Sequence, residues 1–283
     1  ANCQPTGHRH RPRPAQLWRR ACLGSGWILT VGAADTGASV KQPLRDAPLL
    51  LPQDAVLNVA ALRPMIAEAC ADKPDTRTAR TQVARILAEA KAAANATLER
   101  AFALDPRNAL PLIHSQARLT DGVLLLAYEA AEALHPLQVR TDSERLCVLA
   151  VGGFGRSEMA PQSDVDLLFL YPWKITSRAE SVIETLLYIL WDLKLKVGHS
   201  SRTIKDCLRL GREDITIRTA LLEHRYVTGD AALAAELDDK LWSDLFNQQQ
   251  ANIQQYAADV YLDGLEKLAM PSDRIPQCDE ISR

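Results

Sequence analysis

The chain has 283 residues, of which 47% are hydrophobic, 24% are charged and 5% are aromatic. This composition is ordinary for a globular protein and excludes wholesale disorder, a collagen-like fibre and a coiled-coil rod. Because 33 basic residues balance 35 acidic ones, the net charge is −2. No global basic field attracts a nucleic acid, and we expect no nucleic-acid partner, although a small anion can still be held locally.

The six cysteines are scattered, and none forms a C-x-x-C pair or stands at metal-ligand spacing from a histidine. A secreted disulfide framework or a structural zinc site would be denser. The apolar runs at 123–127 and 167–171 are far shorter than the ~20 residues of a membrane-spanning helix. We therefore expect a cytoplasmic protein that does not cross a membrane.

The two ends of the chain differ from the rest. Residues 1–50 hold five prolines, five glycines and seven basic residues against two acidic ones, which predicts a disordered basic tail. The apolar stretch at 27–31 follows two arginines, but it is too short and too interrupted for an export signal. Residues 271–283 contain two prolines and no periodicity, which predicts a ragged end.

Residues 51–136 are predicted to form a helical arm, because they are rich in Ala, Leu, Glu and Arg. One helix is expected over 75–103, where the Asp-Pro pair that follows stops it. A second is expected from a cap at Asn108 to about Leu134.

Residues 137–230 have another pattern, in which short apolar runs are bounded by glycine and proline, and this pattern predicts buried strands. The sequence predicts an α/β (α+β) fold, in which a small mixed sheet is flanked in the chain by helical segments. A further helical segment is expected over 231–270. The expected strands are 146–151, 164–171 and 197–203, and the expected helices lie within 177–196, 214–224, 231–246 and 252–268.

One segment, residues 148–171 (VLAVGGFGRSEMAPQSDVDLLFLY), carries most of the chemistry. Its first strand runs into Gly152 and Gly153, where the lack of side chains lets the backbone approach another group closely. A helix beginning near Phe154 would present free N–H groups and its dipole to an anion such as a triphosphate. A tight turn without a ligand is the alternative, and a glycine pair alone favours that alternative.

Asp164 and Asp166 stand two residues apart at the start of an apolar strand. Because side chains alternate along a strand, both carboxylates project from one face, about 6.6 Å apart. Two like charges beside a buried run repel each other, and a divalent cation with open coordination positions, such as Mg²⁺, would remove the conflict. A solvated strand end is the alternative for such a pair on its own.

A glycine pair followed after ten residues by an Asp-x-Asp pair at the start of an apolar strand resembles the sequence pattern of the nucleotidyltransferase superfamily typified by DNA polymerase β. GGFGRSEMAPQSDVDLLFL is similar to the GGxGRxExxPxSDxDLLxL signature of the bacterial PII uridylyltransferase/uridylyl-removing enzyme family. LLYILWDLKLKVGHSSRTIKDC and DITIRTALLEHRYVTGD resemble companion segments of that family. The resemblance covers about half of the chain.

The resemblance implies transfer of UMP from UTP to a tyrosine hydroxyl of the PII signalling protein, with release of pyrophosphate by in-line displacement. It implies that Asp164 and Asp166 bind Mg²⁺ and that Gly152, Gly153 and Arg156 meet the phosphates. Ser163, which stands directly before the aspartates, would orient them or a phosphate, or cap the turn.

This sequence departs from the superfamily pattern at the third carboxylate, because the strand expected at 197–203 holds no acidic residue. Asp214 is the nearest candidate, and it suits a helix cap equally well. His199 is either a base or a structural residue, and Arg202 either neutralises a phosphate or forms a surface ion pair. Ser157 replaces an expected glycine, so a positive φ there would be mildly strained.

Members of this family also carry a phosphohydrolase domain with a His-Asp doublet and glutamine-sensing domains. None of the six histidines here is followed by Asp, so we expect neither uridylyl removal nor glutamine sensing, and we interpret the chain as an N-terminal fragment. Two alternatives stay open, namely a non-catalytic nucleotide-binding regulatory module and a nucleotidyltransferase with a small-molecule or RNA-end acceptor. The low basicity argues against RNA.

Overall fold

The computed structural model describes residues 48–71, 75–137, 139 and 141–246. The helix predicted at 252–268, the end predicted at 271–283 and residues 1–47 of the predicted basic tail lie outside this part of the chain. The domain boundaries predicted from the sequence stay predictions.

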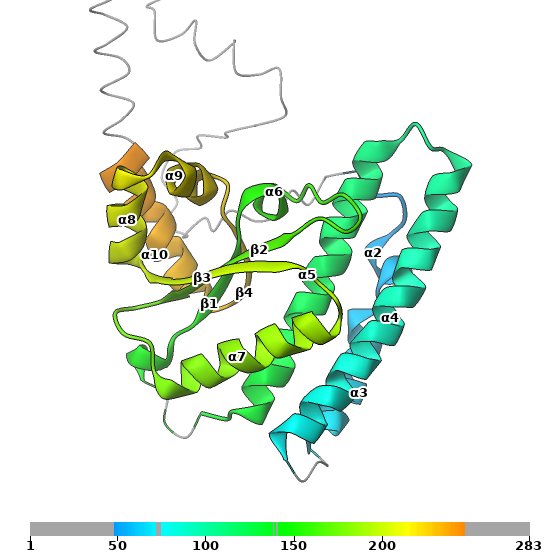
Figure 1. The fold of residues 1–283 in the computed structure, drawn as a ribbon, viewed down its shortest axis with the longest axis horizontal. Coiled ribbons are helices and arrows are strands. Elements are labelled where there is room, and N and C mark those ends of the chain that lie inside the picture. The colour runs from blue at the N-terminus through cyan, green and yellow to red at the C-terminus, as the bar shows by residue number, and fades with distance from the viewer. Residues whose placement is uncertain (1–47, 72–74, 138, 140, 247–283) are drawn as a thin grey trace, which may run out of the picture. The chain divides into compact units, whose positions relative to one another are not determined.

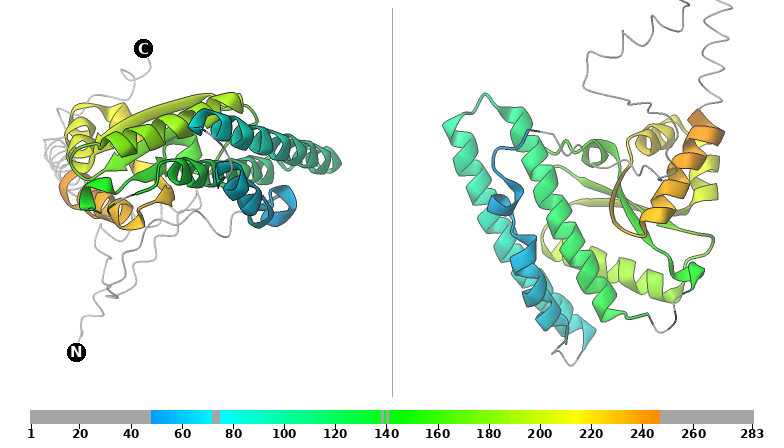
Figure 2. Two further views of the ribbon diagram at one scale, coloured as in Figure 1. Left: turned by 90° about the horizontal axis from the view of Figure 1, so that it is seen from below. Right: turned by 180° about the vertical axis from the view of Figure 1, so that it is seen from behind.

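Four α-helices and a short 3-10 helix (Asp142–Glu144) precede the sheet in the described part of the chain. The first two are α2 (Gln53–Val56) and α3 (Val59–Ala71), and the two long ones are α4 (Thr76–Leu104) and α5 (Ala109–Leu134). Both views of Figure 2 show α4 and α5 side by side. The predicted helices are confirmed, and Asp75 caps α4 by accepting a hydrogen bond of 2.7 Å from the Thr78 N–H. Asn108 occupies the cap position of α5 but makes no side-chain cap hydrogen bond.

Four strands form one mixed sheet with the order β3-β2-β1-β4. β1 lies between β2 and β4 and is antiparallel to both, whereas β2 and β3 are parallel. This topology confirms the predicted mixed sheet. The strands are β1 (Cys147–Ala150), β2 (Val165–Tyr171), β3 (Val197–Thr203) and β4 (Arg225–Gly229).

Helices cover both faces of the sheet (Figure 1). Val165, Leu167 and Phe169 of β2 pack with α4, α5 and α7 (Ser177–Asp192), whereas Leu168 and Leu170 pack with α8 (Ile204–Glu213) and α10 (Ala231–Leu241). Burying each of these side chains contributes about 1.5–3 kcal/mol. Because both faces are buried, β2 is a nearly continuous apolar run, and Asp166 is conspicuous in it.

The sequence prediction missed two elements, α8 and β4. The helix predicted at 214–224 is α9 (Ile215–Leu222), and the helix predicted at 231–246 is α10 followed by a π-helical turn, Trp242–Phe246. The helix expected within 177–196 ends at Asp192. No helix in the described ranges has the length and apolar character needed to cross a membrane.

Candidate active site

Asp166 is held by strands on both of its sides. It is the second residue of β2 and pairs with Gly198 in the parallel register of β2 with β3. Its carbonyl oxygen accepts a hydrogen bond of 3.0 Å from the N–H of Val151, directly after β1. Because side chains alternate, Asp166 lies on the face of the sheet that carries Leu168 and α8–α10. Asp164 is exposed, stands directly before β2 and lies close enough for its charge to act on Asp166, and its place on the same face stays a prediction.

The two carboxylates lack partners in the described part of the chain, where no N–H or O–H group donates a hydrogen bond to Asp164 or Asp166. Partial burial of Asp166 raises its pKa above the ordinary value, and the nearby charge of Asp164 raises it further. The site thus holds negative charge to which no described residue donates a hydrogen bond, and a cation would favour the ionised form of both groups.

Two glycines leave space around the Asp166 carboxylate. A Cβ atom on Gly198 would overlap its Oδ1 atom, and a Cβ atom on Gly152 would lie 3.4 Å from its Oδ2 atom. Gly152 also has a φ of +61°, a conformation that glycine adopts without strain. Both oxygens therefore stay accessible to a ligand.

Asp166 and Gly152 open into one cavity of about 270 Å³. Its wall includes two polar residues of β3, which are His199 and Arg202. It also includes Thr216, at the start of α9. The cavity thus combines a carboxylate, a glycine turn and a cationic side chain, which suits a phosphate-bearing ligand together with a metal ion. No described acidic side chain lies within ion-pair distance of Arg202, although its charge acts on Asp214, and its phosphate-neutralising role stays a prediction.

The glycine turn forms a single helical turn, α6 (Gly152–Gly155). The backbone N–H groups of Gly152 and Gly153 donate to no group in the described part of the chain, so they remain available to an anion. Ser157 follows this turn with a φ of +62°, so the mild strain considered for a non-glycine residue at that position is present.

Arg156 points toward glutamates. Its Nε atom lies 2.9 Å from Glu158 Oε2, and its Nη1 atom lies 2.8 Å from Glu223 Oε2. Glu158 therefore forms a local ion pair with Arg156. The phosphate contact of Arg156 stays a prediction, and it requires the guanidinium to leave these partners or to share them.

Ser163 and Asp214 do not line the Asp166 cavity. The Ser163 hydroxyl donates a hydrogen bond of 2.8 Å to the carbonyl oxygen of Ala160 and closes the turn before β2. Asp214 caps α9 by accepting a hydrogen bond of 2.7 Å from the Thr216 N–H, and this bond lowers the pKa of Asp214. Its role as a third carboxylate stays a prediction.

Arg225 supports the glycine turn, and the sequence analysis did not identify it. This arginine is buried in β4, and its guanidinium lies 2.9 and 3.1 Å from the two Asp121 oxygens of α5. It also donates to the carbonyl oxygens of Phe154 and Gly155, at 3.0 and 3.3 Å. Arg225 therefore ties the turn that borders the site to α5.

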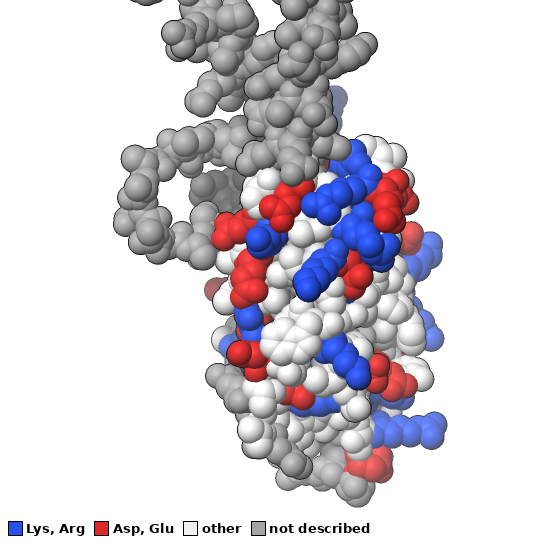
Figure 3. Space-filling model, turned by 90° about the vertical axis from the view of Figure 1, so that its left-hand side faces the viewer, with Lys and Arg blue, Asp and Glu red and all other residues white. Residues whose placement is uncertain are grey.

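The charges on the neighbouring surface are mixed. Figure 3 shows Lys and Arg side chains bordered by Asp and Glu on the face that carries α8. That helix contributes Lys205, Arg209 and Arg212 together with Asp206 and Glu213. Among the described residues in this view, acidic side chains border the basic ones.

Proteins from several bacteria are similar to this chain in sequence. Over 201 residues the chain is 61% identical to a bifunctional uridylyltransferase/uridylyl-removing enzyme of Cereibacter sphaeroides, an alignment that covers 70% of this chain and 22% of that protein. The chain is homologous to bifunctional uridylyltransferase/uridylyl-removing enzymes. The enzyme of Ruegeria pomeroyi is 58% identical over 186 residues, and that of Rhodospirillum rubrum is 41% identical over 190 residues.

The homology to bifunctional uridylyltransferase/uridylyl-removing enzymes confirms the resemblance seen in the sequence. The alignments with the Ruegeria and Rhodospirillum proteins cover 65% and 67% of this chain and 20% of each relative. This chain therefore spans about a fifth of the length of these relatives. No protein-family profile matches it.

Proposed function

We propose that this chain carries the nucleotidyl-transfer site of a uridylyltransferase, which moves UMP from UTP to a tyrosine hydroxyl of the PII protein and releases pyrophosphate. The observation that supports this most is the Asp166 carboxylate, which has no hydrogen-bond donor among the described residues, lies near Asp164 and is surrounded by two glycines. Homology to bifunctional uridylyltransferase/uridylyl-removing enzymes supports uridylyl transfer, and the resemblance of the sequence signature to the PII-modifying family suggests the acceptor.

Asp164 and Asp166 would hold Mg²⁺, since paired carboxylates with open positions are the ligands that this ion takes together with substrate phosphates. When bound, the ion supplies charge neutralisation at the reacting phosphate and at the oxygens that attack and leave. Gly152 and Gly153 would direct their N–H groups at the phosphates, and Arg202 would neutralise phosphate charge from β3. The Asp166 side chain keeps its position because β1 and β3 both bind the backbone around it.

A non-catalytic nucleotide-binding module is the second candidate. One observation favours it. Within the described ranges, no group of three or more His, Cys, Asp or Glu side chains could hold a metal ion. Asp214, the candidate for a third carboxylate, is engaged as a helix cap. Both candidates require the cavity at Asp166 to bind a nucleoside triphosphate.

Labelled nucleotides separate the two candidates. We expect the chain, incubated with Mg²⁺ and purified PII, to transfer label from [α-³²P]UTP to PII, and to transfer less from ATP, GTP or CTP. Binding of UTP without any labelled PII would support the module instead. A chain that neither binds nor transfers UTP would contradict both.

Gly198→Ala tests the space around the carboxylate. The added methyl group would overlap Oδ1 of Asp166, so we expect UMP transfer to fall by about tenfold to a hundredfold as the carboxylate is displaced. Since Gly198 is exposed on an edge strand, the melting temperature should change little. Ser201→Ala, at the opposite face of β3, is the matched control, and an equal loss of activity there would contradict this assignment.

Addition of Mg²⁺ tests the proposed ligands directly. A cation bound only by the native state stabilises that state, so millimolar Mg²⁺ should raise the melting temperature by about 2–5 °C. The increase should vanish in Asp164→Asn/Asp166→Asn. A flat Mg²⁺ response in the unmodified chain, with and without UTP, would argue against a metal ion at this position.

A further inference from the structure

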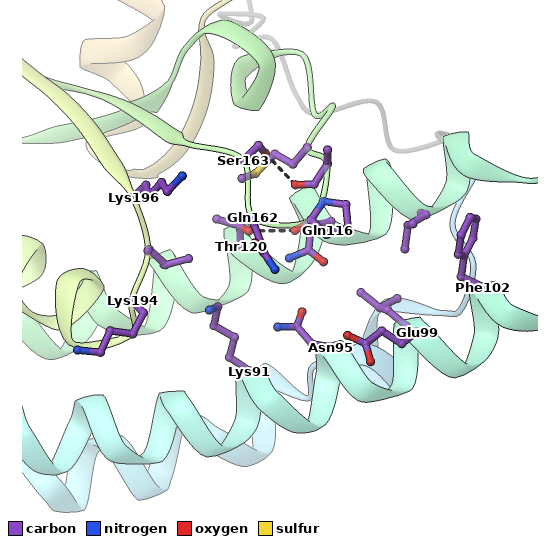
Figure 4. Close-up of a pocket in the computed structure, with 16 residues that line it drawn as sticks. Lys91, Asn95, Glu99, Phe102, Gln116, Thr120, Gln162, Ser163, Lys194 and Lys196 are labelled. Carbon is purple, nitrogen blue, oxygen red and sulfur yellow. Dashed lines mark hydrogen bonds between the residues drawn. The ribbon is translucent and has the colours of Figure 1, made fainter. Parts of the chain in front are cut away.

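A second cavity, of about 420 Å³, lies on the other side of the start of β2 (Figure 4). It is bounded by α4, by α5, by the loop at 159–163 and by residues 194–196, which lead into β3. Ser163 lines this cavity, whereas Asp166 belongs to the opposite face of the strand. The cavity is therefore separate from the proposed transfer site, and the proposed function does not use it.

Polar side chains from four different segments converge in this cavity. Figure 4 shows Lys91 and Asn95 of α4, Gln116 of α5 and Gln162 of the loop pointing toward its middle, and Lys196 pointing in from the strand side. The three amide groups make no side-chain hydrogen bond to any described residue. Hydrogen-bonding groups that face a cavity without partners are the usual way in which a site fixes the orientation of a ligand.

The cavity has a cationic end and an apolar end. Lys91 and Lys196 stand at one end, while Phe102 lies at the other. The lining also includes the apolar residues Leu98 and Leu112. Phe102 follows Lys91 by eleven positions in α4, a distance of about 16 Å along the helix. Glu99 is exposed near the Phe102 end. An elongated ligand with an anionic end and an apolar, planar end would match this order of side chains.

Gln162 occupies a position where glycine would be less strained. It follows Pro161 in a turn closed by the hydrogen bond from the Ser163 N–H to the Ala160 carbonyl oxygen, 3.1 Å, and its φ is +67°. A turn with proline followed by a positive φ favours glycine at the second of these positions. The positive φ of Gln162 costs about 1 kcal/mol of backbone strain. In this conformation the Gln162 amide lies in the cavity.

We propose that this cavity binds a nucleoside phosphate, with its phosphate between Lys91 and Lys196 and its base directed toward Phe102. Lysines act as compact charges for phosphate and need no forked geometry. Side-chain amides pair with the edges of bases, and an aromatic ring stacks on any base. A cavity of this volume lies within the range that holds molecules of nucleotide size.

The position of the cavity connects it to the proposed transfer site. The Lys196 carbonyl oxygen accepts a hydrogen bond of 2.8 Å from the N–H of Val165, the residue between the two aspartates. Gln162 and Ser163 directly precede Asp164. A ligand that contacts Lys196 and Gln162 would hold both segments that position Asp164, so its binding would be coupled to the geometry of the aspartate pair.

Equilibrium dialysis of labelled AMP and UMP tests the proposal. We would use the full chain with Asp166→Asn and EDTA, which suppress binding at the transfer site. One nucleotide per chain should bind, and Lys196→Met and Gln162→Gly should each weaken binding by about tenfold or more. Lys174→Met, an exposed lysine away from the cavity, should leave binding unchanged. Lys91 is not substituted, because its ammonium group also donates a hydrogen bond of 3.2 Å to the Leu193 carbonyl oxygen.

Gln162→Gly separates a ligand role from a structural one. Because glycine relieves the positive φ, this variant should melt at or above the temperature of the parent chain while it loses the nucleotide. The proposal is overturned if neither nucleotide binds, if both variants bind as the parent does, or if pyrophosphate competes as strongly as UMP. None of these results bears on UMP transfer, which is measured on the unmodified chain with Mg²⁺.

Discussion

Replacing Arg225 with methionine is expected to destabilise the protein by about 3–5 kcal/mol. Methionine keeps much of the length of the side chain but leaves the Asp121 carboxylate in a nearly buried position without its bidentate partner. The carbonyl oxygens of Phe154 and Gly155 lose their donor at the same time. Thermal unfolding followed by circular dichroism should show a melting temperature lower by about 10 °C.

We attribute the loss of stability in Arg225→Met to the unpaired charge on Asp121, and a second substitution tests this explanation. In the Arg225→Met background, Asp121→Leu removes the buried unpaired charge, so part of the lost stability should return. Arg63→Met is the matched control, because Arg63 pairs with Glu129 at the surface and exposed pairs contribute little. A double variant that is less stable than Arg225→Met would contradict this explanation.

Loss of Arg225 should also affect the site. The glycine turn at α6 is anchored to α5 mainly through this guanidinium, which also lies over the Phe154 ring at 5.1 Å from its centroid. A Cβ on Gly155 would overlap the carbonyl oxygen of Glu223, so the turn is also closely packed against the end of α9. Stability and site geometry therefore depend on the same contacts, and surviving Arg225→Met protein should transfer UMP more slowly.

Local signals explain which elements the sequence could predict. The bounds of β3, Val197–Thr203, match the prediction. The helix α8 was missed although its signal was present: Thr203 and Asp206 form a capping box. The strand β4 had no such signal, since RYVTG contains too few apolar residues to stand out. Only its pairing with β1 defines it.

The site was predictable to the extent that it depends on neighbours in the chain. Asp164 and Asp166 are predicted to share a face because strand alternation is a local rule. The glycine opposite Asp166 depends on the register of two parallel strands, which no short pattern specifies. The contact of Arg225 with Asp121 joins residues 104 positions apart, and only the assembled fold brings them together.

Asp166→Asn is expected to reduce UMP transfer by about a thousandfold or more, since it removes a charged ligand for Mg²⁺ from the reacting centre. In contrast, the substitution should increase the free energy of unfolding of the metal-free protein. Folding raises the pKa of Asp166, so the protonated form favours the native state, and this contribution is lost as the pH rises through the raised pKa. At neutral pH the ionised carboxylate therefore destabilises the metal-free protein, and asparagine removes that cost.

The combination of lost transfer and retained stability distinguishes a catalytic carboxylate from a structural one. Transfer of label from UTP to PII and thermal unfolding in EDTA should be measured on the same preparations. Asp192→Asn, an exposed aspartate at the end of α7, is the matched control and should leave both quantities unchanged. Asp164→Asn should resemble Asp166→Asn in activity. Transfer at the unmodified rate in either variant would mean that the two carboxylates do not hold the metal ion, and a melting temperature several degrees lower in Asp166→Asn would mean that this carboxylate supports the fold.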